Sequence, residues 1–399
     1  MSLMEMFISK GIEATNNTKI GLNLDIVTKT NADWFLLYSG KGTGKSWATR
    51  ERALKKCIEF KDELLIVKRL EVDCKSAQIR KYFDNVDVLS LTNGEYNSIE
   101  VRGSEIFFAN VDEKFKSHRG IRIGHTIPLS AFERYKGTDY PLVTTIIFEE
   151  FISENNAYLP NESSTLMKLI NTIYRPQTLA EYSILSDDKK ERIKRREVFL
   201  CGNTISRHCV YFNDWYLKNI IHQQPNTIDI YTYRYPQDID EFTNKPREIK
   251  LACWYIGENT QGAKKSHSFV FGKAYDTIVK GDWECDIFPR LEHNYDEYDK
   301  IFEILIKHQN TNYILQLLYC NNEYTLYVYP STSPRNIQRV ISTEYSTSFY
   351  ITNRLMKDRK IEKFIGQLLI LNKIAYSDNL TGTEFNNIKE KLLVGMWGD

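Results

Sequence analysis

Short apolar runs alternate with helix-like patterns from Trp34 to about Tyr233. Runs such as DWFLLYS at 33–39 and TTIIFEEF at 144–151 are typical of strands buried on both faces of a sheet. Between such runs, apolar residues spaced three to four apart predict amphipathic helices. This alternation predicts an α/β domain with a mostly parallel sheet covered by helices. We expect strands at 33–39, 62–70, 98–103, 104–111, 124–130, 144–151 and 197–203, and helices at 45–60, 73–83 and 161–174.

The pattern changes after Tyr235. The stretch PQDIDEFTNKPREIK is polar and carries two prolines, so we expect a linker over 236–260. Beyond it, NYILQLLYCNNEYTLYVYP predicts a hairpin that turns at Asn321–Asn322. The stretch IEKFIGQLLILNKIAY at 361–376 predicts a helix. We therefore expect an α/β domain over 1–235, which begins with a polar N-terminal arm, and a smaller α+β domain over 261–399.

Composition narrows the class of protein. The 399 residues exceed the usual size of one domain, and 42% hydrophobic with 26% charged residues is ordinary for a globular protein. The formal net charge is +1, so contact with nucleic acid would depend on local basic patches. The seven cysteines form no CxxC pair, which favours reduced thiols in a cytosolic protein. No apolar run approaches the ~20 residues that span a bilayer, and the N-terminus does not resemble a signal peptide. We expect an intracellular protein without a membrane partner.

The stretch SGKGTGKS at 39–46 fits a phosphate-binding loop, with Ser39 where glycine is common. Its glycines let backbone N–H groups approach phosphate oxygens, Lys45 reaches the β- and γ-phosphates, and Ser46 ligates Mg²⁺. A strand precedes the loop and a helix follows it, so a helix N-terminus faces the anion. An ordinary glycine-rich turn is the alternative. The sequence thus predicts a site for ATP and Mg²⁺ formed by Gly40, Lys41, Gly42, Thr43, Gly44, Lys45 and Ser46.

Two adjacent carboxylates, Glu149 and Glu150, end the apolar run TTIIFEEF. Ligands of open α/β sheets gather at the carboxyl ends of the strands. We expect Glu149 to hold the metal ion, usually through water, and Glu150 to orient and deprotonate the attacking water. The metal-side residue is commonly aspartate, and Glu149 is one methylene longer. Without the loop, a solvated strand end would explain the pair.

Three further polar residues are candidates for the same site. Asn203 ends the run EVFLCGN and could sense the γ-phosphate, although this residue alone favours an asparagine that caps a turn. Arg175 follows a predicted helix and precedes a proline, and Lys136 lies shortly before the Glu149 strand. Either cation could enter a neighbouring subunit's pocket, yet the residues alone favour exposed surface charges. Basic clusters at 68–69, 187–197 and 353–364 could grip phosphates, and a solvated surface explains each of them.

An ordered series of motifs resembles the DNA-packaging ATPases of small phi29-like podophages, which are relatives of the large terminase subunits. The series runs from about Leu36 to Phe212 and consists of SGKGTGKS, VKR, IPLS, YKGTDYP, TIIFEEF, YLPNESSTLMKLINTIYR and CGNTISRHCVYF. The resemblance implies an ASCE-type P-loop ATPase domain. It also implies a homopentameric ring that acts on the procapsid in the cytoplasm of the infected host and pumps double-stranded DNA inward.

The resemblance also implies roles for single residues. It makes Lys45 and Ser46 the phosphate and Mg²⁺ ligands, and it places Lys41 where the family's loop carries a basic residue. By the same resemblance, Glu149 is the metal-side carboxylate, Glu150 is the catalytic one and Asn203 is the sensor. Arg175 falls on the arginine finger that acts on the adjacent subunit, and Lys136 falls on a basic residue directed at the adjacent subunit's nucleotide.

The second domain, by the same resemblance, is RNase H-like and has lost its nuclease site. YILQLLYC, taken as the first hairpin strand, has no carboxylate, and EYTLYVYP has only Glu323 at its start, so we expect no nuclease activity. The resemblance implies that this domain contacts a capsid-vertex partner, either portal protein or a packaging RNA. The function we expect is an ATP-driven DNA packaging motor. The alternatives are a P-loop helicase or partition ATPase, and a nucleotide-gated DNA-binding scaffold that does not hydrolyse ATP.

Overall fold

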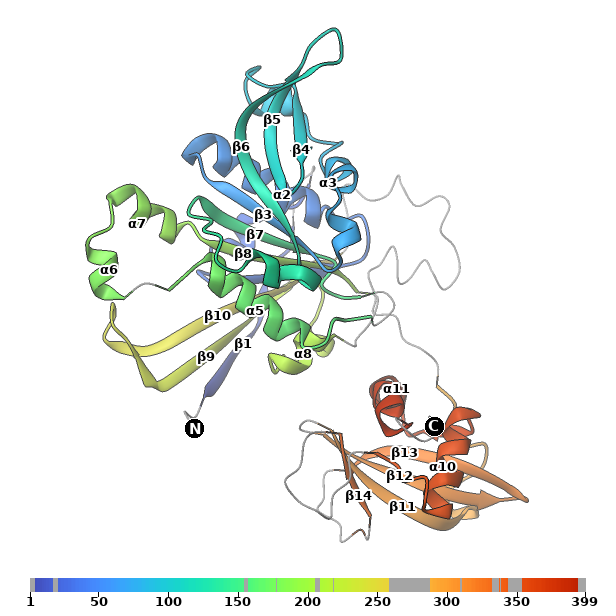
Figure 1. The fold of residues 1–399 in the computed structure, drawn as a ribbon. Helices are drawn as coiled ribbons and strands as arrows, with labels where there is room; N and C mark the ends of the chain where they lie inside the picture. The colour runs from blue at the N-terminus through green and yellow to red at the C-terminus, as the bar shows by residue number, and fades with distance from the viewer. Residues whose placement is uncertain are drawn as a thin grey trace. The chain divides into compact units, whose positions relative to one another are not determined.

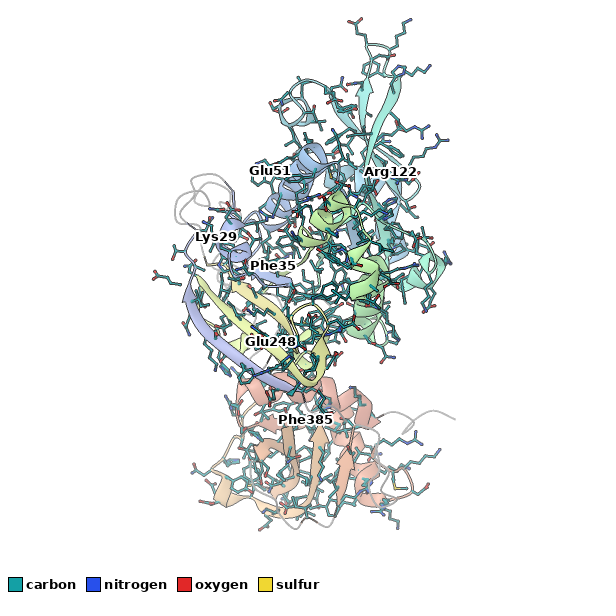
Figure 2. All side chains as sticks on the ribbon, turned by 90° about the vertical axis from the view of Figure 1, so that its left-hand side faces the viewer. Lys29, Phe35, Glu51, Arg122, Glu248 and Phe385 are labelled. Atoms are coloured by element: carbon teal, nitrogen blue, oxygen red, sulfur yellow. The ribbon has the colours of Figure 1, made fainter. Side chains whose placement is uncertain are left out.

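The computed structural model describes residues 4–16, 21–153, 157–176, 178–204, 209–217, 219–257, 288–308, 311–331, 337, 339–343 and 354–393. The chain divides into two compact units, Met1–Trp283 and Glu284–Asp399 (Figure 1). Each unit has its own buried core. Phe35, for example, lies inside the first unit and Phe385 inside the second, whereas Glu51 lies at the surface of a helix (Figure 2).

The first unit is built on a ten-stranded sheet with the order β1-β9-β10-β2-β8-β7-β3-β6-β5-β4. The strands from β10 to β6 in this order are all parallel, and antiparallel strands flank them on both sides. The strands are β1 Glu5–Glu13, β2 Trp34–Ser39, β3 Glu63–Lys68, β4 Ser98–Arg102, β5 Glu105–Val111, β6 Ser117–Pro128, β7 Val143–Glu149, β8 Glu197–Asn203, β9 Thr227–Asp240 and β10 Lys245–Tyr255.

Helices cover both faces of the central strands (Figure 1). The helix α2 supplies Leu54 and Cys57 to the core on one face, and α5 supplies Leu166 and Leu169 to the core on the other. The mostly parallel centre and the two helical layers confirm the predicted α/β class. The α-helices are α1 Asp25–Thr28, α2 Lys45–Phe60, α3 Ser76–Tyr82, α4 Val88–Leu91, α5 Glu162–Ile173, α6 Leu179–Ser183, α7 Asp187–Lys194 and α8 Val210–Asp214, and the 3-10 helices are η1 Glu71–Cys74, η2 Leu129–Tyr135 and η3 Ile220–His222.

The prediction was wrong at the expected linker. Most of 236–260 belongs to the sheet, because β9 and β10 form an antiparallel pair and β10 also pairs in parallel with β2. The two prolines misled the interpretation, since Pro246 lies where the register of the hairpin shifts and Pro236 lies among the residues that this shift leaves unpaired. The α/β domain therefore extends beyond residue 235, and residues 258–287 lie outside the described part of the chain.

The expected N-terminal arm is also a strand over part of its length. Its residues Glu5–Glu13 form β1, which pairs antiparallel with β9 at the edge of the sheet. Met6 and Ile8 pack against the core while most of the strand is exposed. An edge strand with only one partly buried face carries few apolar residues, so its hydrophobic signal in the sequence is weak.

The second unit contains a five-stranded sheet with the order β14-β11-β12-β13-β15. Strands β11, β12 and β13 form an antiparallel meander, β14 runs parallel to β11, and β15 runs parallel to β13. Its elements are η6 Tyr295–Glu297, β11 Asp299–His308, β12 Thr311–Cys320, β13 Glu323–Ser331, β14 Val340–Ser342, α10 Lys360–Ile370, β15 Ile374–Tyr376 and α11 Asn379–Leu393. This is the predicted α+β architecture.

Details of the second unit confirm one prediction and correct two. The hairpin turns at Asn321–Asn322, where both residues have positive φ, as a two-residue turn requires. The helix expected over 361–376 ends at Ile370, because Asn372 takes a left-handed conformation and 374–376 form β15. The first strand of the meander is β11, which carries Asp299 and Glu303, so the carboxylate argument was applied to the wrong strand.

A buried ion pair fixes α5 against the end of β3. The Arg69 Nε and Nη2 atoms donate to the two oxygens of Glu162, at 2.8 and 3.0 Å. The Glu162 side chain is fully buried and also accepts from the Tyr211 hydroxyl and the Leu159 N–H, each at 2.8 Å. Arg69 therefore has a structural role and is not an unpaired surface cation.

Replacing Arg69 with methionine is expected to lower the free energy of unfolding by about 3–5 kcal/mol, because it leaves a buried carboxylate without its cation. Chemical denaturation of the full chain measures this change. Arg134→Met is the matched control, since Arg134 pairs with Glu71 at 2.8 Å with both side chains exposed. Its expected effect is below about 1 kcal/mol. Equal effects of the two variants would show that the Arg69 pair contributes no more than a surface pair.

Candidate functional site

The loop between β2 and α2 contains two glycines in a left-handed backbone conformation. β2 ends at Ser39, and α2 begins at Lys45 with Gly44 as its N-terminal cap. Gly42 and Gly44 have φ values of 82° and 88°, a left-handed conformation that a side chain would strain. The N-terminus of α2 therefore directs its unpaired N–H groups toward the carboxyl end of the parallel strands, where an anion is favoured.

Lys45 reaches back over this loop. Its Nζ donates to the carbonyl oxygen of Gly40 at 3.1 Å and to Oδ1 of Asn203 at 3.2 Å, and it also contacts the hydroxyls of Ser39 and Thr43. Burial lowers the pKa of the Lys45 ammonium to about 8, although nearby Glu149 and Cys201 oppose this shift. The ammonium is thus surrounded by neutral oxygen atoms, and an anionic ligand would stabilise its charged form.

Ser46 and Glu149 form a pair of oxygen ligands at the start of α2 and the end of β7. The Ser46 Oγ donates to Oε2 of Glu149 at 2.7 Å, and Glu149 is only 6% exposed. A hydroxyl and a carboxylate at hydrogen-bond distance are the donor set that Mg²⁺ prefers beside phosphate. The residues present therefore fit a magnesium ion, and the extra methylene of Glu149 does not prevent the contact.

Glu150 lies directly after β7 and has a different environment. It is exposed, and its φ of 58° is left-handed, which is uncommon for a glutamate. A cavity of about 330 Å³ adjoins both glutamates and is lined by Lys68, Arg69, Asp73, Gln78, Lys81, Tyr82, Glu149 and Glu150. The buried carboxylate of Glu149 is therefore joined to Ser46, while that of Glu150 adjoins solvent, from which a water molecule could be drawn.

Asn203 is brought to the loop by the order of the strands. β8 lies between β2 and β7, and its last residue is the register partner of Ser39. The Asn203 side chain accepts a hydrogen bond from Lys45. The structure thus brings Lys45, Ser46, Glu149 and Asn203 together from neighbouring elements. Their chemical roles stay predictions.

Arg175 lies near the amino-terminal ends of the central strands, opposite the loop, whereas Lys136 directly follows η2, which begins at the carboxyl end of β6. The hydroxyl of Tyr174 donates to the carbonyl oxygens of Thr144 and Glu197, which lie at the starts of β7 and β8. Arg175 follows Tyr174 and forms an exposed ion pair with Asp139 at 3.1 Å. Lys136, three residues before Asp139, pairs with Glu133. Since β7 has seven residues, its two ends are about 20 Å apart at ~3.3 Å per residue, so the fold does not bring Arg175 to the loop of its own chain.

Sequence reasoning missed Tyr82, the last residue of α3. Its hydroxyl donates to Oε1 of Glu149 at 2.8 Å. Burial and the nearby Glu149 carboxylate raise the pKa of Tyr82 well above its usual value, so the phenol stays a neutral donor. No local pattern in the sequence marks this residue, because the contact depends on how α3 packs against the end of β7.

The basic cluster at 187–197 is largely occupied by contacts within the chain. Arg192 and Arg195 both bind the buried carboxylate of Asp62, with Nε–O distances of 3.1 and 2.9 Å. Arg196 donates to the carbonyl oxygen of Tyr174 at 2.7 Å. Arg192 and Arg195 attach the end of α7 to the loop before β3, and Arg196 attaches it to the residue after α5. These three arginines are therefore not free surface charges. No helix in the described part of the chain is long and apolar enough to cross a membrane.

Comparison with known proteins identifies relatives of this chain. The model of the family described as Podovirus DNA encapsidation protein (Gp16) matches residues 28–340. The DNA packaging protein of Bacillus phage phi29 is 25% identical over 305 residues, which are 71% of this chain and 82% of that protein. The DNA packaging protein of Bacillus phage B103 is 34% identical over 137 residues, so the matched region spans only 38% of that protein and 34% of this chain.

Two solved structures have a similar fold. One is the bacteriophage Phi-29 viral genome packaging motor assembly, with a TM-score of 0.55 and 17% identity, covering 93% of this chain and 99% of that one. The other is the Phi-28 gp11 DNA packaging motor, with a TM-score of 0.51 and 17% identity, covering 96% and 100%. At this level of identity the two structures show a shared fold.

Proposed function

The chain belongs to the podovirus DNA encapsidation protein family, and from this premise we propose that it is an ATP-hydrolysing motor that translocates double-stranded viral DNA into a procapsid. The observation that carries the proposal is the constellation at the carboxyl ends of β2, β8 and β7. There, Lys45, Ser46, Glu149 and Asn203 are joined by hydrogen bonds of 2.7 and 3.2 Å. This is the arrangement expected of a P-loop ATPase of the ASCE type.

The chemistry follows from the position of each group. The amides of the loop and the Lys45 ammonium bind the β- and γ-phosphates of ATP, and Asn203 contacts the same lysine and lies beside the γ-phosphate. Ser46 and Glu149 would hold Mg²⁺, which would neutralise charge on the phosphate oxygens. Glu150 orients the attacking water and accepts its proton.

The location of Arg175 favours a ring. A residue at the amino-terminal ends of the strands cannot serve its own loop, yet it can serve the loop of a neighbour through a head-to-tail interface, and such an interface forms a ring when its rotation closes. We therefore assign Arg175 as a trans-acting finger. The family resemblance makes Lys136 a second cation directed at the neighbour's nucleotide. We take the ring to be a pentamer, assembled on the portal vertex of the procapsid in the host cell.

The second unit fits a partner-binding domain of RNase H-like form. Support comes from its three-stranded antiparallel meander with the parallel strand β14 beside the first strand. The Glu303 carboxylate of β11 accepts from the Gln316 side chain at 3.1 Å and lies 3.6 Å from the Lys300 ammonium. We propose that this unit contacts portal protein or a packaging RNA and does not cleave DNA.

Double-stranded DNA is expected to stimulate ATP hydrolysis, and turnover per chain is expected to rise with protein concentration. The reason is that a pocket completed by a neighbour's arginine works only after assembly. Steady-state phosphate release, measured with and without DNA across a dilution series, tests both expectations. Arg175→Ala is the matched control and should stay low at every concentration.

Other outcomes would favour other functions. Strand separation on a forked substrate, without preference for the duplex, would indicate a helicase. Tight ATP binding with no phosphate release at any concentration would indicate a nucleotide-gated scaffold. Concentration-independent turnover would contradict the shared pocket.

A further inference from the structure

We propose that Tyr82 positions the metal-side carboxylate of Glu149 and thereby sets the affinity of the site for its divalent cation. This inference rests on the proposed function, because it assigns a role within the same pocket. Tyr82 would be a positioning residue, since its hydroxyl contacts Glu149 and not the reacting atoms.

The carboxylate of Glu149 is held between two hydroxyl donors. The Ser46 Oγ donates to Oε2 at 2.7 Å, and the Tyr82 hydroxyl donates to Oε1 at 2.8 Å. The donors belong to different helices, α2 and α3, so the carboxylate cannot rotate without losing at least one bond. Each carboxylate oxygen still has a free lone pair that can face a cation or one of its water ligands.

Tyr82 is itself fixed by two cations. The Arg50 guanidinium donates to the main-chain oxygen of Tyr82, and its centre lies 5.0 Å from the centroid of the Tyr82 ring. The Lys68 ammonium lies 5.4 Å from the same centroid. Both distances are within the range of cation–π attraction. Lys68 at the end of β3 and Arg50 of α2 therefore hold the phenol ring in position.

The spacing along α2 places these contacts on one side of the helix. Ser46 and Arg50 are four residues apart, so they lie one above the other on the same face. The first contacts the carboxylate of Glu149, and the second contacts the tyrosine that holds the other oxygen of that carboxylate. One face of α2 therefore contacts both members of the Tyr82–Glu149 pair, Glu149 through Ser46 and Tyr82 through Arg50.

This arrangement explains how a glutamate can stand where aspartate is common. Glutamate has one more rotatable bond, and an unrestrained side chain would lose more conformational entropy when the cation binds. The Tyr82 hydroxyl holds the longer side chain in the folded protein before the cation arrives. An aspartate at position 149 would be too short to keep both donors at hydrogen-bond distance.

The Tyr82→Phe variant of the full chain tests the inference, because it removes one oxygen atom and retains the ring. Loss of a hydrogen bond to a charged group is expected to weaken divalent-cation binding by about tenfold or more. Mn²⁺ binding in the presence of a non-hydrolysable ATP analogue, followed by electron paramagnetic resonance, measures this directly. The Mg²⁺ concentration at half-maximal ATP turnover should rise by a similar factor. Affinity for the analogue without divalent cation should stay within about twofold.

Two further variants separate positioning from folding. Tyr231→Phe is the matched control, since Tyr231 is a buried tyrosine of β9 outside the site, and it should bind Mn²⁺ as the parent chain does. In the background of Glu149→Asp, the Tyr82→Phe change should have little further effect, because the shorter side chain has already lost the contact. Multiplicative effects of the two changes, or unchanged Mn²⁺ affinity in Tyr82→Phe, would overturn the inference.

The Mn²⁺ measurement does not require turnover. It decides the role of Tyr82 even if the parent chain binds ATP without hydrolysing it, a result that would count against the motor alone. A lower melting temperature of Tyr82→Phe with unchanged Mn²⁺ affinity would assign the hydroxyl a purely structural role and would refute positioning.

Discussion

Replacing Glu150 with glutamine is expected to reduce ATP turnover by about 10²–10⁴-fold, because the side chain loses its ability to accept a proton while keeping its size. ATP binding should persist, since the loop, Lys45 and Ser46 are unchanged. Steady-state phosphate release and equilibrium binding of a fluorescent ATP analogue measure the two properties separately. The expected combination is a chain that binds the nucleotide and does not turn it over.

A second carboxylate beside the same cavity provides the control for Glu150. Asp73 also lines this cavity, and Asp73→Asn removes the same charge from the pocket without changing the predicted base. Its turnover should stay within about threefold of the parent chain. Comparable losses in both variants would indicate a general electrostatic effect, and normal turnover by Glu150→Gln would remove the assignment of the catalytic base.

Arg175→Ala is expected to lower turnover by about 10³-fold or more, the usual contribution of an arginine finger. Folding should be preserved, because the ion pair with Asp139 is exposed on both sides and such pairs contribute about 0–1 kcal/mol. Phosphate release from chains at assembling concentration measures the loss. Circular dichroism and thermal unfolding establish that the variant is folded.

Mixing the two inactive variants distinguishes action on a neighbour from action within one chain. In a mixed ring, an Arg175→Ala subunit retains Glu150, and an adjacent Glu150→Gln subunit can supply the missing arginine. Turnover should therefore return in the mixture and not in either variant alone. A mixture that stays inactive would assign Arg175 to its own subunit or to structure. The same experiment with Lys136→Ala tests the second cation.

The loop and the paired glutamates could be predicted because their information is local. A strand, a turn and a helix stand next to one another in SGKGTGKS and its flanks, and the two acids end an unbroken apolar run. The position of Asn203 beside Lys45 depends on the strand order, which the sequence analysis did not predict. The strand β8 had to lie between β2 and β7 for this contact to form.

The predictions were wrong where a residue's role depends on partners that lie far away in the sequence. The outer half of the β9–β10 pair is polar because solvent surrounds it, while the buried residues Leu251 and Trp254 fall in the second half of the stretch interpreted as a linker. Arg192 and Arg195 read as a surface cluster because their partner, Asp62, lies 130 or more residues earlier in the chain. Tyr82 was missed for the same reason, since its partner Glu149 lies 67 residues away.

Glu150 has a left-handed backbone conformation, which among the other non-glycine residues in the described part of the chain is adopted mostly by asparagine. A left-handed backbone costs roughly 1–2 kcal/mol at most other residues that carry a side chain. Glycine at position 150 would therefore remove this conformational cost and raise the melting temperature of the chain. Selection for heat resistance alone would favour glycine at position 150, and it would remove the carboxylate that we propose as the catalytic base.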